Sequence, residues 1–475
     1  MSCAADIFAG QRVAVFGLGR SGISCGRALM AGGADVLAWD DGAAGRAAGE
    51  RAGLPLADLR EVDFATLAAL VLAPGVPFTH PEPHWTVKKA QAAGVEIICD
   101  VEVFFRQLAG SGARLVAVTG TNGKSTTTAL IGHVLRHNHL DAHIGGNIGK
   151  PVFDLPPPAH GRIYVVETSS YQIDLSPTLR PDVGVLLNVS PDHLDRHGDM
   201  DNYAAVKGRL FANMGGGDTA VISVDDAYSR RTLDNLPRDV AARPVSVETM
   251  LDDGVCVLDG VLHERAGGKT LKGCDLSLAR ALQGRHNWQN AAAAWAACRA
   301  LRLDGGMIAG ALGSFPGLAH RMELVAESGG VRFVNDSKAT NADAAARALS
   351  TFEDIFWLAG GRAKQGGIAA LGDYAPRIRQ AFLFGEAAGG FAASLRRAGV
   401  AHQVFERLDD AFAAAASAAA ELATATGARP VVLLAPAAAS FDHYASFEAR
   451  GEHFRRLAEA VAAAAPRKEG ETACD

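Results

Sequence analysis

Short apolar runs alternate with longer segments of mixed polarity along most of the chain. Runs rich in Val, Leu, Ile and Ala occupy residues 12–16, 35–39, 70–72, 96–99, 115–119, 163–166, 183–187, 331–334, 355–358, 381–384 and 431–434. Continuous apolar runs separated by helical segments are typical of parallel strands that helices cover on both faces. The pattern therefore predicts an α/β fold of mainly parallel sheets.

The length of the chain and the spacing of these runs predict three domains. A chain of 475 residues is too long for one hydrophobic core. We expect domains at residues 1–112, 113–316 and 317–475, the outer two Rossmann-like and the central one similar to phosphate-loop ATPases. Residues 220–272 are expected to be β-rich. The alanine-rich residues 411–423 predict a surface or packing helix, because alanine is too weakly apolar for a membrane span.

A glycine-rich loop, Gly-Thr-Asn-Gly-Lys-Ser-Thr at residues 120–126, lies between an apolar run and a helical segment. Strand, glycine turn, Lys-Ser and helix are the layout of a phosphate-binding loop, with Lys124 for the outer phosphates and Ser125 for a magnesium ion. The loop is shorter than the general motif, which would place its first glycine at Val118. ATP binding is the leading hypothesis, and a glycine-rich β-turn is the alternative.

A second glycine loop opens the chain. Gly17-Leu18-Gly19-Arg20-Ser21-Gly22 follows the first apolar run, and Asp40 and Asp41 end the next. This pattern alone would indicate a dinucleotide site and a dehydrogenase. However, the fingerprint requires only a diphosphate at a helix N-terminus, and a UDP-sugar also carries one. Because the chain also has a nucleotide loop at Gly120, a dehydrogenase with redox chemistry alone is the weaker hypothesis.

The amino-acid composition argues against one class of binding partner and indicates the cellular compartment of the protein. The net charge of −6 offers no basic field for nucleic acid. Seven cysteines without close pairing predict free thiols in a reducing cytoplasm. The N-terminus shows no signal-peptide pattern. We therefore expect a cytoplasmic enzyme without membrane insertion.

Four further motifs occur at residues 167–172 (Glu-Thr-Ser-Ser-Tyr-Gln), 188–196 (Asn-Val-Ser-Pro-Asp-His-Leu-Asp-Arg), 284–290 (Gly-Arg-His-Asn-Trp-Gln-Asn) and 335–341 (Asn-Asp-Ser-Lys-Ala-Thr-Asn). With the loop at 120–126, their order resembles that of the Mur ligase family, ATP-dependent enzymes that build the peptide stem of peptidoglycan. The last motif resembles that of members adding D-glutamate to UDP-N-acetylmuramoyl-L-alanine. Another Mur-type or a folylpolyglutamate-type ligase, and a nucleotide-binding module without turnover, are the alternatives.

The resemblance implies an ATP site and a magnesium site. Such ligases first phosphorylate a carboxylate, and an amine then attacks the acyl phosphate. The implied cofactors are ATP and two Mg²⁺ ions, with Lys124, His193 and Lys207 catalytic and Lys207 carbamylated. The implied metal ligands are Ser125, Glu167, His193 and Lys207. The implied ATP contacts are Gly120, Thr121, Asn122, Gly123, Lys124, Ser125, Thr126, Asn287, Asn290, Arg321 and Asp336.

The resemblance also implies two substrate sites on a monomer. For the UDP-substrate it implies Gly19, Arg20, Ser21, Gly22, Asp40 and Asn147. For D-glutamate it implies Lys338, Thr340, Lys364, Ser440, Phe441 and Phe447. One departure is Ala73 in Ala-Pro-Gly, where family members often have a serine, so one hydroxyl donor to uridine is lost.

Simpler interpretations of single residues stay open at this point. Glu167 would otherwise be an N-cap or an exposed strand-end acid, and His193 a hydrogen-bonded structural histidine. By spacing alone, Lys207 would be a solvated helix lysine and Asn147 a left-handed turn residue. Other such interpretations are a salt bridge for Arg321, core packing for Phe441 and Phe447, and competition of Arg362 with Lys364.

Overall fold

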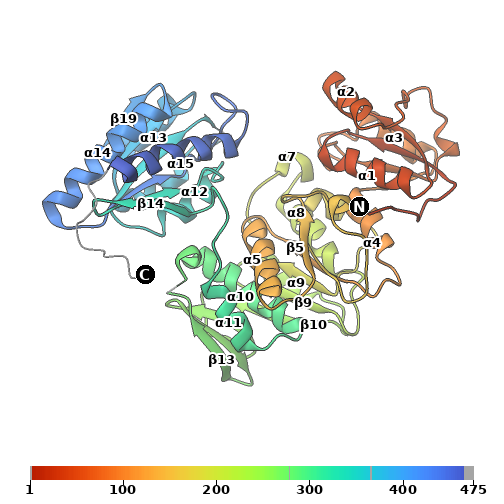
Figure 1. Cartoon of the computed structure of the whole chain (residues 1–475), viewed down its shortest axis with the longest axis horizontal. Helices are drawn as coiled ribbons and strands as arrows, with labels where there is room; N and C mark the ends of the chain where they lie inside the picture. Colours follow the sequence, from red (N-terminus) through yellow and green to blue (C-terminus); the bar gives the residue numbers. More distant parts are fainter. Residues whose placement is uncertain (1–2, 278, 364–365, 465–475) are drawn as a thin grey trace, which may run out of the picture. The chain divides into compact units, whose positions relative to one another are not determined.

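The computed structural model describes residues 3–277, 279–363 and 366–464. The chain divides into two compact units, Met1–Ala279 with Asn287–Phe315, and Arg280–His286 with Pro316–Asp475. Helices flank each main sheet (Figure 1). The predicted α/β class with mainly parallel sheets is confirmed.

The first sheet has the strand order β2-β1-β3-β4, and all its neighbours are parallel. β1 and β3 are buried along nearly their whole length, which explains their continuous apolar sequences. The strands are β1 (Arg12–Phe16), β2 (Asp35–Trp39), β3 (Ala69–Leu72) and β4 (Glu96–Ile98). The helices are α1 (Arg20–Ala31), α2 (Ala43–Arg51), η1 (Phe64–Thr66), α3 (Trp85–Ala92) and α4 (Asp100–Gln107).

The second sheet has the order β13-β12-β11-β10-β9-β8-β5-β7-β6. It is parallel from β6 to β11, and β11, β12 and β13 are antiparallel, so the β-rich segment is confirmed. Its strands are β5 (Arg114–Thr119), β6 (Ala142–Gly146), β7 (Ile163–Glu167), β8 (Val183–Leu186), β9 (Thr219–Ser223), β10 (Ala241–Ser246), β11 (Gly254–Leu258), β12 (Val261–Ala266) and β13 (Lys269–Asp275).

The following helices lie between residues 113 and 316. They are α5 (Lys124–His137), η2 (Val152–Asp154), α6 (Ser170–Asp174), α7 (Leu194–His197), α8 (Met200–Gly208), η3 (Arg209–Phe211), α9 (Ala227–Asp234), η4 (Arg280–Leu282), α10 (Arg285–Ala300) and α11 (Gly305–Gly313). Among all helices in the described residues, none is long and apolar enough to cross a membrane.

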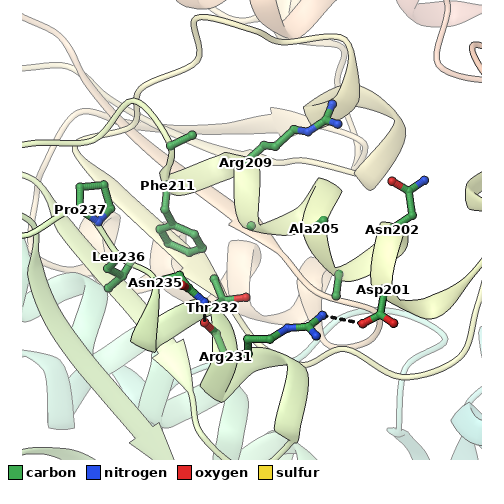
Figure 2. Close-up of a pocket in the computed structure, with 13 residues that line it drawn as sticks. Asp201, Asn202, Ala205, Arg209, Phe211, Arg231, Thr232, Asn235, Leu236 and Pro237 are labelled. Carbon is green, nitrogen blue, oxygen red and sulfur yellow. Dashed lines mark hydrogen bonds and ion pairs between the residues drawn. The ribbon is translucent and has the colours of Figure 1, made fainter.

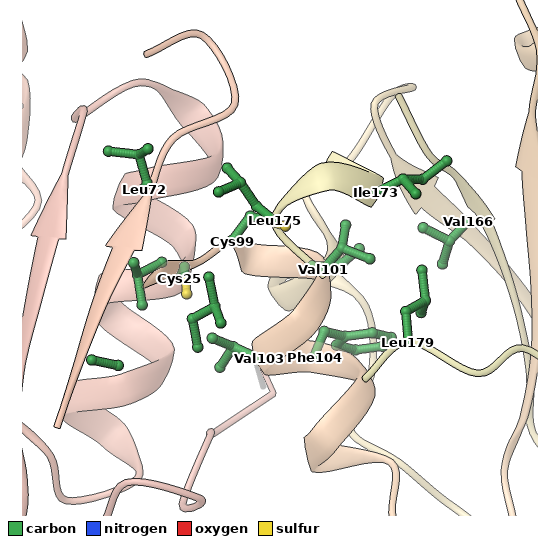
Figure 3. Packing of buried hydrophobic residues seen from close by; sticks show 14 of the residues in the cluster. Cys25, Leu72, Cys99, Val101, Val103, Phe104, Val166, Ile173, Leu175 and Leu179 are labelled. Carbon is green, nitrogen blue, oxygen red and sulfur yellow. The ribbon is translucent and has the colours of Figure 1, made fainter. Parts of the chain in front are cut away.

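One hydrophobic core continues from the first sheet into the second. Helix α4 lies between them, with Leu72 and Cys25 on one side and Ile173 and Val166 on the other (Figure 3). The Phe104 ring of α4 meets the rings of Phe153 and Tyr164 edge-on, with centroids 5.6 Å and 5.0 Å away. The Ser24 hydroxyl also donates to Asp154 at 2.7 Å. The two sheets are therefore packed as one body.

The third sheet has the order β14-β15-β20-β16-β18-β19, with a separate pair β17-β21. Its strands are β14 (Glu323–Ser328), β15 (Val331–Asn335), β16 (Ile355–Gly360), β17 (Arg362–Ala363), β18 (Ile378–Phe384), β19 (His402–Phe405), β20 (Val431–Leu434) and β21 (Ala438–Ala439). Its helices are α12 (Ala342–Leu349), η5 (Ala369–Arg377), α13 (Ala388–Arg397), α14 (Leu408–Thr426) and α15 (Phe447–Ala464).

Helices α14 and α15 cover one face of this sheet, and α12 and α13 cover the other. The alanine-rich segment is α14, which buries Ala411, Ala415, Ala419 and Ala423 against phenylalanines of the strands. These alanines are spaced four apart and form one helical face. The prediction of a packing helix is therefore confirmed.

Candidate active site

The loop after β5 has the geometry of an anion cradle. Gly120 and Gly123 have φ angles of 149° and 86°. A Cβ on Gly123 would lie 2.3 Å from Asn290 Oδ1, so only glycine fits there. Helix α5 begins at Lys124, directly after the loop. Its N-terminus therefore faces the end of the loop with the positive pole of the helix dipole.

Lys124 is held by the loop that it follows. Its Nζ donates to the carbonyl oxygens of Gly120 at 2.9 Å and Thr121 at 2.8 Å. Ser125, in the first turn of α5, is buried. A lysine fixed at the mouth of the loop, beside a serine hydroxyl, is the pair that phosphates and a magnesium ion require.

Buried amides support the loop from behind. Asn188 accepts from the Asn122 backbone N–H at 2.9 Å and donates to Gln289 Oε1 at 2.9 Å. Gln289 donates onward to Ser223 at 2.8 Å. The roles of Asn188 and Gln289 were not predicted, although both belong to the quoted motifs. Only the fold shows that these two motifs meet behind the loop.

The two asparagines predicted to contact ATP share one face of α10. Asn290 Nδ2 donates to Asn287 Oδ1 at 3.1 Å, and the Thr127 hydroxyl donates to Asn290 Oδ1 at 3.1 Å. Both asparagines are buried. The structure therefore places Asn290 beside the phosphate loop, and its contact with ATP stays a prediction.

Lys207 is buried, so its interpretation as a solvated helix lysine was wrong. Its side chain is 1% exposed, and Nζ donates to the Gly120 carbonyl at 2.9 Å. That carbonyl also accepts from Lys124. Burial and the neighbouring Lys124 charge lower the pKa of Lys207 well below its usual value, although Asp192 acts in the opposite direction. These conditions favour the neutral amine, which is the form that reacts with carbon dioxide.

Glu167 ends β7 and is 2% exposed, so it is not an exposed strand-end acid. It is not an N-cap either, because Ser169 caps α6. Its Oε1 accepts from Asn147 Nδ2 at 3.0 Å, whereas Oε2 has no hydrogen-bond partner in the described residues. A buried carboxylate oxygen left unsatisfied is expensive. The donor set therefore fits a magnesium ion, which prefers hard oxygen ligands.

Asn147 follows the end of β6 beside this carboxylate. The positive φ angles belong to its neighbours Gly146 (98°) and Gly149 (61°), so the interpretation of Asn147 as a left-handed turn residue was wrong. Its backbone N–H donates to the Glu167 carbonyl at 2.9 Å. Together with the side-chain bond, this attaches Asn147 to the strand end on which the proposed metal ligand sits.

His193 lies on an exposed loop. Its side chain is 43% exposed and forms an ion pair with Asp192 at 3.4 Å. The described residues contain no group of three or more His, Cys, Asp or Glu side chains that could hold a metal ion. The structure therefore does not bring His193 into a ligand cluster of that kind. Its neighbour His197 is buried, bonded to the Ser170 hydroxyl at 2.9 Å, and has a pKa lowered to about 4, mainly by burial.

The first glycine loop is closed tightly at the start of α1. A Cβ on Gly22 would lie 2.0 Å from the Gly17 carbonyl oxygen, which requires glycine. Asp40 Oδ2 accepts from the Leu18 backbone N–H at 2.7 Å, so this predicted contact of the UDP-substrate also fixes the loop. A cavity of about 450 Å³ adjoins the loop and is lined by Leu18, Gly19, Arg20, Ile23, Ser24, Arg27, Ala48, Pro151 and Asp154.

A larger cavity of about 870 Å³ lies between α8 and α9 (Figure 2). From α8 it is lined by Asp201, Asn202, Ala204, Ala205 and Gly208, and Lys207 is not among its lining residues. An ion pair between Asp201 and Arg231 at 2.8 Å bridges part of its rim. None of the predicted site residues lines it, so the cavity is separate from the phosphate loop.

In the second unit, Asp336 and Lys338 follow β15. Asp336 is buried, and burial raises its pKa to about 7, although Arg321 opposes this. Lys338 Nζ lies 4.0 Å from the centroid of the Phe447 ring, which is a cation–π contact. The Thr340 backbone N–H donates to the Lys338 carbonyl at 2.7 Å. Two of the predicted D-glutamate residues, Lys338 and Phe447, are thus in direct contact.

The remaining D-glutamate residues differ in exposure. Ser440 is 2% exposed, whereas Phe441 is 64% exposed, so core packing of Phe441 was wrong. Lys364 lies outside the described residues. Arg362 pairs with Glu386 through Nε at 3.0 Å and Nη2 at 2.9 Å, which occupies its guanidinium and argues against the proposed competition with Lys364.

Three features are those of an enzyme of nucleotide-dependent phosphoryl transfer: a phosphate loop backed by buried amides, two lysines on one carbonyl, and a buried carboxylate oxygen without a hydrogen-bond partner in the described residues. Two family models match the chain, the Mur ligase middle domain at residues 118–298 and the Mur ligase glutamate ligase domain at residues 320–438. The chain belongs to the Mur ligase family.

Two relatives are similar to this chain over nearly its full length. A UDP-N-acetylmuramoylalanine–D-glutamate ligase of Caulobacter vibrioides is 51% identical, covering 94% of this chain and 95% of its own. The enzyme of that name from Bradyrhizobium diazoefficiens is 52% identical, covering 97% and 98%. Among solved structures, a UDP-N-acetylmuramate-alanine ligase from Thermotoga maritima has a TM-score of 0.59 at 17% identity, covering 95% and 99%, and supports the fold alone.

Proposed function

We propose that this chain is a ligase that joins D-glutamate to UDP-N-acetylmuramoyl-L-alanine and converts ATP to ADP and phosphate, in peptidoglycan biosynthesis. The observation that carries the proposal is the identity of 51–52% with ligases of that name over 94–97% of the chain. The phosphate loop and its buried support supply the nucleotide chemistry that this reaction needs. The same comparisons disfavour a dehydrogenase and a folylpolyglutamate-type ligase.

The reaction proceeds in two displacement steps. An oxygen of the L-alanine carboxylate attacks the γ-phosphorus of ATP, the bond to the β-phosphate oxygen breaks, and ADP leaves. The amino nitrogen of D-glutamate then attacks the carbonyl carbon of the acyl phosphate, loses a proton, and inorganic phosphate leaves. Lys124 and the N-terminus of α5 stabilise the charge on the transferring phosphoryl oxygens. The loop amides orient ATP for in-line attack.

Magnesium fits the residues around the loop. Ser125 and Glu167 would hold it, since Glu167 Oε2 is buried and without a partner in the described part of the chain. The ion supplies charge neutralisation to the phosphate oxygens. From the resemblance of the motif at residues 188–196, we infer a second ion with His193 and carbamylated Lys207 as ligands, although the structure places His193 outside any cluster of three such side chains in the described residues. The lowered pKa of Lys207 supports the carbamate, because only the neutral amine reacts with carbon dioxide, and the neighbouring Lys124 charge would stabilise the anion that forms.

The substrate sites follow the order of the sequence. We assign the UDP-substrate to residues 1–112 with Asn147, ATP to residues 113–316, and D-glutamate to residues 317–475. The cavity beside Gly19 and Arg20 supports the first assignment, and the contact of Lys338 with Phe447 supports the third. The roles of Arg321 and Asp336 toward ATP remain predictions from the resemblance. We further propose a cytoplasmic monomer.

The decisive experiment measures ADP release from ATP with purified protein and each candidate substrate. UDP-N-acetylmuramoyl-L-alanine with D-glutamate should support turnover, whereas L-glutamate and L-lysine should not. Turnover with L-lysine but not with D-glutamate would refute the assignment. The carbamate is tested separately by ¹³C NMR with labelled bicarbonate: a carbamate signal should appear for the wild type and be lost in Lys207→Arg.

A further inference from the structure

Arg450, in the first turn of α15, is completely buried. Nε donates to the Ser337 hydroxyl at 3.0 Å, and Nη2 donates to the Ser337 carbonyl at 2.9 Å and the Ala438 carbonyl at 3.1 Å. Nη1 donates to the Gly360 carbonyl at 3.2 Å. Burial lowers its pKa to about 10, so the guanidinium stays charged at neutral pH.

The partners of this buried charge are unusual. In the described residues no carboxylate forms an ion pair with Arg450, and every bonded oxygen is neutral. By contrast, the partly buried Arg106 bonds two carboxylates, Glu96 and Glu102. Asp442 attracts the guanidinium only through space, without a hydrogen bond or ion pair in the described residues. A buried charge whose bonded partners are all neutral is unfavourable compared with an apolar side chain of similar size. Its presence therefore calls for a use beyond packing.

Two of the three segments that Arg450 joins carry proposed D-glutamate residues, and the third directly precedes Lys364 in the sequence. Ser337 directly precedes Lys338, Gly360 ends the strand that leads to residues 361–363, and Ala438 lies two residues before Ser440. Gly361 has a φ of 125°, and a Cβ there would lie 2.9 Å from Arg450 Nη1. The segments thus pack against the guanidinium without spare room.

Helix α15 itself completes the arrangement. Phe447 lies three residues before Arg450, on the same helical face. Its carbonyl accepts from the Ser337 hydroxyl at 2.9 Å, and its ring receives Lys338. The planar guanidinium fixes several acceptors at once in a geometry that a lysine ammonium cannot reproduce. One side chain therefore sets the relative positions of three loops and a helix end.

We propose that Arg450 is a positioning residue for D-glutamate, holding the segments of Lys338, Ser440 and Phe447 in register. This inference rests on the proposed function. Arg450→Lys keeps a hydrogen-bond donor on a long side chain but loses the planar fork. We expect it to raise KM for D-glutamate at least about tenfold, while kcat at saturating D-glutamate and KM for ATP stay within about twofold. A tenfold rise in KM is the size of effect expected when one charge-assisted hydrogen bond is lost.

Steady-state ADP release with D-glutamate, ATP or UDP-N-acetylmuramoyl-L-alanine varied in turn is the test. The wild type is measured first, because absence of turnover with D-glutamate refutes the proposed function rather than this inference. Arg455→Lys on the same helix is the matched control, since Arg455 pairs with Glu323 and Glu452 and should leave every KM unchanged. Unchanged KM for D-glutamate in Arg450→Lys, or equal rises for all substrates, would overturn the proposal.

If Arg450→Lys does not fold, the variant Ser337→Ala tests the positioning role of Arg450. It removes the hydroxyl that accepts from Arg450 and donates to Phe447, and leaves the carbonyl contacts intact. We expect about a threefold rise in KM for D-glutamate alone. A Ser337→Ala variant with all kinetic constants of the wild type would contradict the positioning role.

Discussion

Neutralising Glu167 should make the protein more stable and less active. In the described residues, Glu167 Oε2 is buried without a hydrogen-bond partner, while Oε1 is held by Asn147. Glu167→Gln keeps the shape and the bond from Asn147 but removes the charge. A buried polar group without a partner destabilises a fold by about 1–3 kcal/mol, and by more when the group is charged, so a neutral amide at this position costs less than the carboxylate. Without magnesium, the variant should therefore gain about 1–2 kcal/mol in its free energy of unfolding.

That gain corresponds to a rise of about 2–6 °C in Tm for a unit of this size. Magnesium should stabilise the wild type by RT ln(1 + [Mg²⁺]/Kd), about 2.7 kcal/mol at a hundred times Kd, and the variant much less. The ligase rate should fall about a hundredfold or more, because a preorganised charge at the phosphoryl site is lost. Stability and activity thus move in opposite directions.

The assay is thermal unfolding in EDTA and in millimolar magnesium, together with ADP release. Glu102→Gln is the matched control, since Glu102 is also fully buried but bonds Arg106 at 2.8 Å and the Thr178 backbone N–H at 3.3 Å. It should lose about 1–3 kcal/mol and keep its response to magnesium. If Glu167→Gln lowered Tm in EDTA as this control does, or kept full activity, the assignment of Glu167 to the metal would be refuted.

Three further predictions concern other residues. Lys124→Met should lower the rate about a hundredfold or more with the fold retained by circular dichroism; wild-type turnover would exclude the loop assignment. Phe441→Ala should change stability by less than about 0.5 kcal/mol in urea titration, because the ring is 64% exposed; a larger loss would mean that the ring packs in a core. Burial raises the pKa of Asp336 to about 7, so the native state binds the proton more tightly than the unfolded chain. The contribution of Asp336 to the free energy of unfolding should be present below about pH 4 and decline as pH rises to 7. In urea titrations from pH 4 to 8, Asp336→Asn should flatten the fall of the free energy of unfolding with pH. An unchanged fall would contradict the raised pKa of Asp336.

Much of the fold could be predicted from the sequence because parallel strands are buried on both faces. β1 and β20 lie at the predicted positions, and most other core strands agree within a residue or two. The missed strands have other patterns: β14 and β19 are partly exposed, and β6 ends in two glycines. Such strands form because they pair with a neighbouring strand, and no continuous apolar run marks them in the sequence.

The part of the site whose functional residues follow one another in the sequence could be predicted. The loop at 120–126 is such a case. Burial of Lys207 could not be foreseen, because the spacing on α8 is the same for a solvated and a buried lysine. The convergence of Asn188 with Gln289, and of Arg450 with three separate segments, depends on long-range packing that no local pattern contains.

The core shared by the first two sheets has a consequence for recombination of this gene. Because α4 contributes Val101, Phe104 and their neighbours to both sheets, a cut near residue 112 would divide a hydrophobic interior and not a linker. A chimera that took its first sheet from a distant ligase would need the matching surface around Ile173 and Leu175 as well. We therefore expect substitutions of first-sheet residues that face this interior to be tolerated only together with matching substitutions around Ile173 and Leu175.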